Sequence, residues 1–197
     1  MARPQDDHLW ALAQAERAAL AEDLAGLSTG QWRHETLCGQ WDVEQVVAHL
    51  TAAASLNQRR LAEHRGRTPA ETLDQFRAVI TSTTAPSSHT PAYLGEVVVH
   101  SQDIRRPLGL VRTPSVDALT PVAEFFARRD FAVASRTRVA DLQLQADDGP
   151  FATGTGPLVT GSTLALVMSM AGRVSYVAEL DGPGVPALRS RVQAAAA

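Results

Sequence analysis

The chain has 197 residues, 45% of them hydrophobic, which suits one or two folded domains and excludes disordered and fibrous proteins. Its net charge is -3, and no run of basic residues alternates with aromatic ones, so we expect no nucleic acid partner. Every apolar stretch is shorter than the roughly 20 residues that cross a bilayer, and residues 1–10 do not resemble a signal peptide. The sequence therefore predicts a soluble, cytoplasmic protein without a membrane partner.

The inventory of reactive side chains is narrow. All 18 basic residues are arginine, so Schiff bases, phosphate-loop lysines and lysine general bases are excluded. The single cysteine, Cys38, excludes an internal disulfide and a zinc site made of cysteines alone, and we interpret it as a packing residue. Any catalytic activation must therefore come from histidine, a carboxylate, Cys38 or a bound ion.

The first two thirds of the chain have the hydrophobic period of amphipathic helices. The predicted helices cover residues 8–27, 42–64, 68–83 and 92–106. The second begins at Asp42, an N-cap with Gln45 three residues later, and the third begins at Thr68. Between the first two helices, we expect a loop whose tryptophans, Trp32 and Trp41, hold it against the helices.

The hydrophobic period changes near residue 137. One more amphipathic helix is predicted over 120–135. Apolar and polar residues then alternate over 139–145, which indicates a strand, and a turn at 147–149 leads into a second short strand near Phe151. Residues 154–162 are expected to be extended or turning, and two further helices are predicted. These helices cover residues 164–172 and 186–192. The expected protein is mainly α, with a helical bundle in residues 1–136 and a small α+β module in residues 137–197.

Three side chains form a candidate metal site. Glu96 and His100 are four residues apart on one predicted helix, so they project from one face about one turn apart. With His49 from the second helix, they give two histidines and one carboxylate, a ligand set suited to zinc or a similar ion with an open coordination position. The alternatives are a hydrogen-bonded core histidine at 49 and an exposed pair of Glu96 and His100.

Two segments resemble the motifs of a known family. Residues 38–50 resemble Trp-x-Val-x-x-Val-x-x-His-Leu, and residues 94–105 resemble Glu-x-x-x-His-x-x-Asp-Ile-Arg, both from the mycothiol-dependent maleylpyruvate isomerase family of the DinB-like superfamily. Residues 172–173 and 180–184 are similar to the C-terminal module of that family. The resemblance spans nearly the whole chain, and the two longer motifs are specific in combination.

The resemblance implies a DinB-like four-helix bundle that holds a divalent metal, commonly zinc, through His49, Glu96 and His100. It also implies an actinobacterial source, with mycothiol as cosubstrate. The expected enzyme is an isomerase or S-transferase that activates this thiol as a metal-bound thiolate for addition to, or isomerisation of, a small electrophile. The connection between residues 66 and 91 is shorter than in the isomerase, so maleylpyruvate is one substrate among many that fit.

Four further residues are candidates for supporting roles. Asp103 follows His100 on the same face and is expected either to orient a ligand histidine or to pair with a nearby arginine. Asn57 and Arg60 continue the face of His49 and are candidates for binding the polar part of the thiol, although Arg60 also suits a solvated position. Arg173 is a candidate for binding an anionic substrate, or alternatively a helix-terminal arginine without a catalytic role.

Two other functions fit the same residues. A metal-dependent hydrolase would use the open position for water, because a bound cation lowers the pKa of that water. A module that binds metal or a small molecule without turnover would have a filled fourth position and no cleft beside the ion. The chain is expected to be a monomer or a homodimer.

Overall fold

The structure is a computed structural model, and it describes residues 4–55 and 66–194. The chain divides into two compact units, Met1–Arg112 and Thr113–Ala197. The change of hydrophobic period near residue 137 therefore falls inside the second unit. The helix at Val116–Arg128 (α6) belongs to that unit because its apolar residues pack against the helix at Thr163–Met170 (α8).

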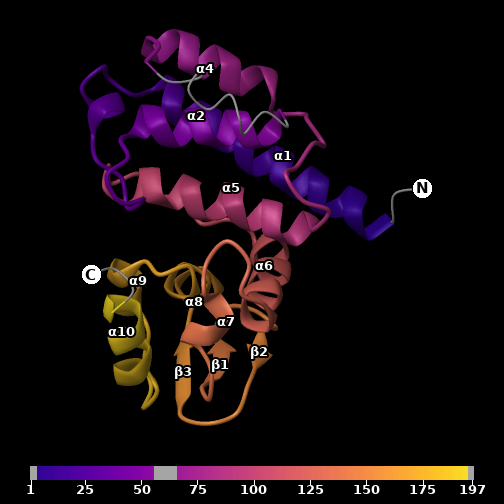
Figure 1. Cartoon of the computed structure of the whole chain (residues 1–197), viewed down its shortest axis with the longest axis vertical. Coiled ribbons are helices and arrows are strands. Elements are labelled where there is room, and N and C mark those ends of the chain that lie inside the picture. The colour runs from indigo at the N-terminus through magenta and orange to yellow at the C-terminus, as the bar shows by residue number, and fades with distance from the viewer. Residues whose placement is uncertain (1–3, 56–65, 195–197) are drawn as a thin grey trace. The chain divides into compact units, whose positions relative to one another are not determined.

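The first unit is the expected four-helix bundle (Figure 1). Its helices are α1 (Pro4–Ala25), α2 (Val43–Ala54), α4 (Pro69–Ala78) and α5 (Thr90–Arg105), and a short 3-10 helix, η1, covers Gln31–Arg33. The helix α1 packs on α5 and α4, and α2 packs on α4 and α5. None of the helices in the described ranges is long and apolar enough to cross a membrane.

Local signals at the helix starts account for the bundle's register. The Asp42 side chain accepts a hydrogen bond from the Gln45 amide while the Gln45 side chain accepts one from the Asp42 amide, which completes the predicted capping box. Thr68 and Glu71 form the same motif at the start of α4. The loop before α2 is held as predicted, since Trp32 is buried in the core and Trp41 packs against it.

The second helix is described only as far as Ala54, with Ser55 as its C-cap. The prediction that it continues to residue 64 concerns residues 56–65, which lie outside the described part of the chain. Asn57 and Arg60 lie in the same segment, so their predicted contacts with a cosubstrate stay predictions.

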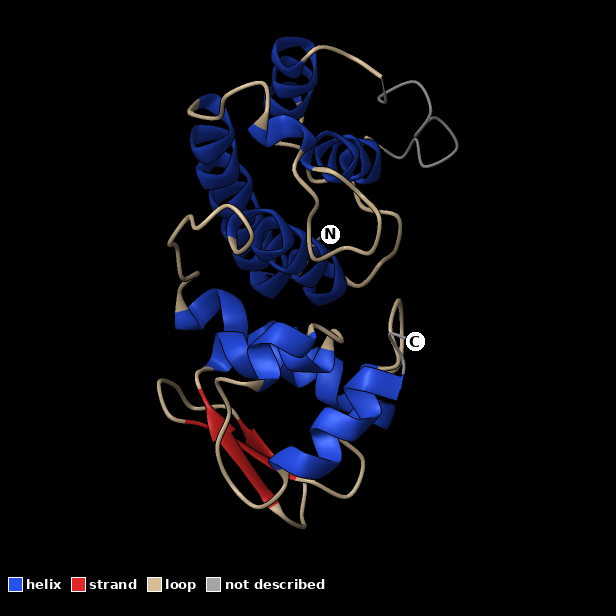
Figure 2. Cartoon of the chain, turned by 90° about the vertical axis from the view of Figure 1, so that its left-hand side faces the viewer, coloured by secondary structure: helices blue, strands red, loops and turns tan. Residues whose placement is uncertain are grey.

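The second unit combines helices with a small sheet (Figure 2). Its elements are α6, α7 (Ser135–Arg138), β1 (Gln143–Ala146), β2 (Ala152–Thr153), β3 (Leu158–Gly161), α8, α9 (Val174–Val177) and α10 (Val185–Ala194). The strand order is β2-β1-β3, with β1 antiparallel to β2 and parallel to β3. The predicted turn at 147–149 does connect two antiparallel strands, and α8 packs on β1 and β3.

Several predicted boundaries in this unit are wrong. The helix expected at 120–135 begins after Ser115, whose hydroxyl caps the Ala118 amide, and it ends at Arg128, so Phe131 is outside it and 52% exposed. The strand expected from 139 begins only at Gln143, because Val139 caps α7 and Asp141 has a left-handed φ of 58°. β3 falls within residues 154–162, the segment expected to be extended or turning, whereas the sequence of α9 has no periodic signal that predicts a helix.

Candidate metal centre

Helices α2 and α5 bring the three predicted ligands together. His49 comes from α2, and Glu96 and His100 come from α5. One ligand atom from each, a ring nitrogen or a carboxylate oxygen, lies within 4.8 Å of the other two. His49 Nε2 is hydrogen-bonded to Glu96 Oε1, and His100 Nε2 lies 3.5 Å from the same oxygen. The three donors therefore converge on one point, although they come from segments 47 residues apart.

The convergence follows from the local structure of the two helices. Glu96 and His100 are one turn apart on α5, whose neighbouring residues Val97 and Val98 are fully buried and fix its rotation. The three side chains are themselves only partly exposed: His49 by 21%, Glu96 by 27% and His100 by 12%. The cluster thus lies at the margin of the core, partly shielded from solvent.

The electrostatics of the cluster suit a cation. Burial alone raises the pKa of Glu96, but hydrogen bonds from His100 and His49 and their positive charge lower that pKa well below its usual value. Burial alone lowers the pKa of His100, but hydrogen bonds with Asp103, Cys38 and Glu96 raise that pKa well above 6.5. Protonated His100 and ionised Glu96 therefore stabilise each other in the metal-free protein, and a divalent cation supplies the same positive charge.

Asp103 contacts the Nδ1 side of the His100 ring, and Glu96 faces its Nε2 side. Its Oδ2 lies 3.0 Å from His100 Nδ1, and its side chain is completely buried. A carboxylate in this place accepts the Nδ1 proton and leaves Nε2 free to bind a metal ion. The spacing of three residues along α5 had suggested this contact, and the structure shows it.

Cys38 also lies beside His100, a position that the sequence interpretation missed. Cys38, His100 and Asp103 form a second group of donors, again within 4.8 Å of one another. The loop before α2 reaches α5 because the Leu37 amide donates to the Asp103 carbonyl oxygen at 3.1 Å. No spacing rule connects a loop with a helix more than 60 residues later in the chain, so only the fold reveals this contact.

The residues fit a zinc ion or a similar divalent cation. Two imidazole nitrogens and one carboxylate oxygen are typical ligands of such an ion in a site that keeps an open position. His49 and His100 lie edge to face, with ring centroids 5.0 Å apart and planes at 77°, and the Trp41 ring lies 5.2 Å from that of His49. The Trp41 ring thus packs against His49, and the buried Asp103 orients His100.

Arg173 belongs to the second unit. It follows Gly172, whose φ of 94° turns the chain after α8, and its Nη1 donates to the Ala171 carbonyl oxygen at 2.9 Å. The guanidinium of Arg138 packs on Gly172 and donates to the Met170 carbonyl oxygen at 2.8 Å. Two arginines thus meet the C-terminal end of α8, where the helix dipole is negative. The predicted role of Arg173 with an anionic substrate stays a prediction.

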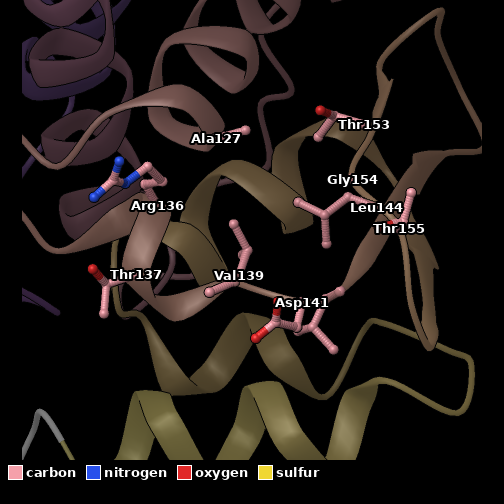
Figure 3. Close-up of a pocket in the computed structure, with 11 residues that line it drawn as sticks. Ala127, Arg136, Thr137, Val139, Asp141, Leu144, Thr153, Gly154 and Thr155 are labelled. Carbon is pink, nitrogen blue, oxygen red and sulfur yellow. The ribbon is translucent and has the colours of Figure 1, made fainter.

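The second unit also contains a hollow of about 430 Å³ (Figure 3). Its floor is apolar, with Val139, Leu142 and Leu144, and its charged lining residues are Arg136 and Asp141. Neither histidine nor cysteine lines it, so its residues do not form a ligand set for zinc. Of the hollow and the cluster in the bundle, the cluster has the residue types of a metal ligand set.

Comparison with known proteins finds a family model and two crystal structures that are similar to this chain. Residues 13–85 match the family model for the mycothiol maleylpyruvate isomerase N-terminal domain, a range that includes His49. A crystal structure of the mycothiol-dependent maleylpyruvate isomerase has a TM-score of 0.64 and 15% identity, and one of a histidine-to-alanine mutant has 0.62 and 14%. Each of these two matches covers 90% of this chain and 92% of the isomerase chain. No sequence among curated proteins matches. At these identities the two structures establish the shared fold.

Proposed function

We propose that the chain belongs to the mycothiol maleylpyruvate isomerase family, whose N-terminal domain model matches residues 13–85, and that it is a metal-dependent enzyme that uses a small thiol. The thiol is mycothiol or a close relative, and the reaction is addition to, or isomerisation of, a small electrophile. The observation that carries the proposal is the convergence of His49, Glu96 and His100 in the bundle. The family match and the similarity to isomerase structures support the choice of thiol and electrophile.

The proposed ligands are His49 and His100 through Nε2 and Glu96 through its carboxylate. A divalent cation, zinc in the first instance, supplies a positive charge at which a thiol loses its proton and becomes a nucleophile at neutral pH. The chain's own groups prepare this site, because Asp103 accepts the Nδ1 proton of His100 and the neighbouring apolar residues of α2 and α5 are buried.

The substrate-binding groups are proposed from chemistry. Arg173 carries a charge that suits an anionic substrate, and Asn57 and Arg60 carry donors that suit the polar part of the thiol. Maleylpyruvate, the substrate named for the two similar structures, is the first electrophile to test. We further propose that the enzyme works in the cytoplasm of an actinobacterium as a monomer or homodimer, with small molecules as its only partners.

The test combines metal analysis with turnover. Purified protein is reconstituted with zinc, and the metal content is measured for the wild type, His49→Ala, Glu96→Gln and His100→Ala, with the exposed His8→Ala as control. We expect about one zinc ion per chain in the wild type and the control and a large loss in the other three. Equal metal content in all five proteins would contradict the site.

The reaction is then tested with and without thiol. We expect the zinc-loaded wild type to convert maleylpyruvate only when mycothiol is present, and His49→Ala to be inactive. Hydrolysis of an ester or amide without thiol would favour the metal-dependent hydrolase, because the same ligands lower the pKa of a bound water. Tight zinc binding without turnover of any electrophile would favour a binding module.

A further inference from the structure

Tyr93, on α5, has a buried hydroxyl group that makes no hydrogen bond in the described part of the chain. The side chain is 3% exposed, and its oxygen is fully shielded from solvent. Buried hydroxyl groups in proteins are nearly always hydrogen-bonded, because an unsatisfied one costs folding free energy. The Tyr93 hydroxyl therefore has a donor that no described group of the chain accepts, and a bound molecule can supply the acceptor.

The ring of Tyr93 is held firmly. Trp10 packs against it with ring centroids 5.2 Å apart, and the guanidinium carbon of Arg17 lies 5.5 Å from its centroid. Arg17 is itself completely buried, and it donates hydrogen bonds to the carbonyl oxygens of Val79 and Ser82. Because these contacts fix the ring, the direction of the hydroxyl group is fixed as well.

Helix geometry and a chain of hydrogen bonds relate Tyr93 to the elements that carry the candidate metal centre. Along α5, Tyr93 precedes Glu96 by three residues and His100 by seven, the spacing of residues on one face of a helix. Arg17, on α1, donates to the Ser82 carbonyl at 2.6 Å, and the Ser82 hydroxyl donates to the carbonyl of Ala54, the last residue of α2, at 2.7 Å. The Arg17 guanidinium, which lies over the Tyr93 ring, is therefore linked through Ser82 to the end of α2, between one and two turns beyond His49.

The burial and charges around the Tyr93 hydroxyl keep it protonated, so it remains a hydrogen-bond donor. Burial raises the pKa of Tyr93, the nearby Arg17 lowers it and Glu96 raises it, and the net effect is a pKa above the ordinary value of 10.0. The phenol thus keeps its proton at neutral pH. The partners of Arg17 in the described residues are carbonyl oxygens and the Tyr93 ring, so no carboxylate neutralises its charge there.

We propose that the Tyr93 hydroxyl donates a hydrogen bond to a carboxylate or carbonyl oxygen of the molecule that binds beside His49, Glu96 and His100. The charge of Arg17 behind the ring favours a carboxylate. This proposal rests on the proposed function, since it requires a small molecule at that centre. Tyr93 is then a binding residue that selects for an oxygen acceptor about one helical turn from Glu96.

The chain contains only two tyrosines, Tyr93 and Tyr176, which permits a direct test. The full-length, zinc-loaded protein is labelled with 3-fluorotyrosine, and the two fluorine resonances are assigned with Tyr93→Phe and Tyr176→Phe. Mycothiol and maleylpyruvate are then added separately. We expect one of them to shift the Tyr93 resonance and to leave that of Tyr176 in place, and the one that does so identifies the source of the oxygen.

Binding affinities provide the second readout. The dissociation constant of the same probe is measured for the wild type, Tyr93→Phe and the control Tyr176→Phe, whose ring is also buried. We expect Tyr93→Phe to weaken binding by about 10-fold to 100-fold, as for a lost hydrogen bond to a charged acceptor. Zinc content stays unchanged, and the melting temperature stays the same or rises, because the variant removes an unsatisfied hydroxyl.

The outcomes separate this proposal from the proposed function. A probe that binds the wild type and Tyr93→Phe equally, or leaves the Tyr93 resonance unmoved, overturns the role of Tyr93 and leaves the thiol enzyme standing. If neither probe binds the zinc-loaded wild type, both proposals fail. The fluorine measurement on the wild type decides the question even where Tyr93→Phe does not fold.

Discussion

His100 connects the candidate metal centre to the buried interior. Its Nε2 faces Glu96 at 3.5 Å, and its Nδ1 faces Asp103 at 3.0 Å. Since a neutral imidazole has one donor and one acceptor nitrogen, an Nδ1 proton directed to Asp103 leaves the lone pair of Nε2 for a cation. Asp103 thus determines which tautomer of His100 is available to the metal.

Replacing Asp103 by asparagine is expected to weaken zinc binding. The amide keeps the shape of the side chain, but it lacks the negative charge that favours the Nδ1 proton of His100. We expect a loss of about 10-fold to 100-fold in zinc affinity, measured by competition with a chelating dye. Asp74→Asn, on the exposed side of α4, is the matched control. Equal affinities in the two variants would show that Asp103 only packs.

Zinc binding is expected to release protons at neutral pH. The pKa of His100 is raised well above 6.5, so this ring carries a proton in the metal-free protein that the cation must displace. Calorimetry in buffers of different ionisation enthalpy should show about one proton released per zinc ion near pH 7, and zinc affinity should fall as the pH is lowered. Zinc uptake without proton release would mean that His100 is not a ligand.

At the scale of elements, the centre depends on where α2 begins and how α5 is rotated. The capping box at Asp42 fixes the first residue of α2, and His49 follows two turns later. On α5, the buried valines set the face that Glu96 and His100 occupy. A helix shifted by one residue would rotate its ligand by about 100° and separate the donors.

Asp42→Ala is expected to destabilise α2. The variant removes the acceptor for the Gln45 amide, a bond of 2.8 Å, and a lost N-cap costs about 1 kcal/mol. Asp42→Asn retains an oxygen that accepts the same hydrogen bond and serves as the control. The free energy of unfolding by urea is the measurement, and an alanine variant as stable as the asparagine variant would contradict the importance of the cap.

For the whole molecule, the cluster makes the stability of the metal-free protein depend on pH. The folded state raises the pKa of His100, so the stabilising contribution of this residue is complete below 6.5 and is lost as the pH rises through the raised value. It lowers the pKa of Glu96, whose contribution is present above 4.5 and is lost as the pH falls through the lowered value. Both contributions are complete between 4.5 and 6.5.

The comparison of wild type with His100→Gln isolates this effect. In the presence of a chelator, the wild type is expected to exceed the variant in unfolding free energy by more at about pH 6 than at about pH 8.5. Urea unfolding of both proteins at the two pH values measures this difference in unfolding free energy. A difference that is constant, or that grows towards alkaline pH, would contradict the raised pKa of His100.

Much of the bundle could be predicted from the sequence because its signals are local. The helical period, the capping residues at Asp42 and Thr68 and the spacing of Glu96 and His100 all act within a few residues, so they fixed the helix starts and the shared face. The second unit was predicted less well. Its short strands and helices, such as β3 and α9, depend on contacts with other segments more than on their own periodicity.

The sequence by itself determined the ligand types and the one face that Glu96 and His100 share, since helix geometry follows from spacing alone. Only the tertiary structure decided that His49 meets them, that Cys38 lies beside His100 and that the hydroxyl of Tyr93 is buried without a partner in the described chain. Each of these depends on packing between segments distant in the chain, which is set by the complementarity of whole buried surfaces.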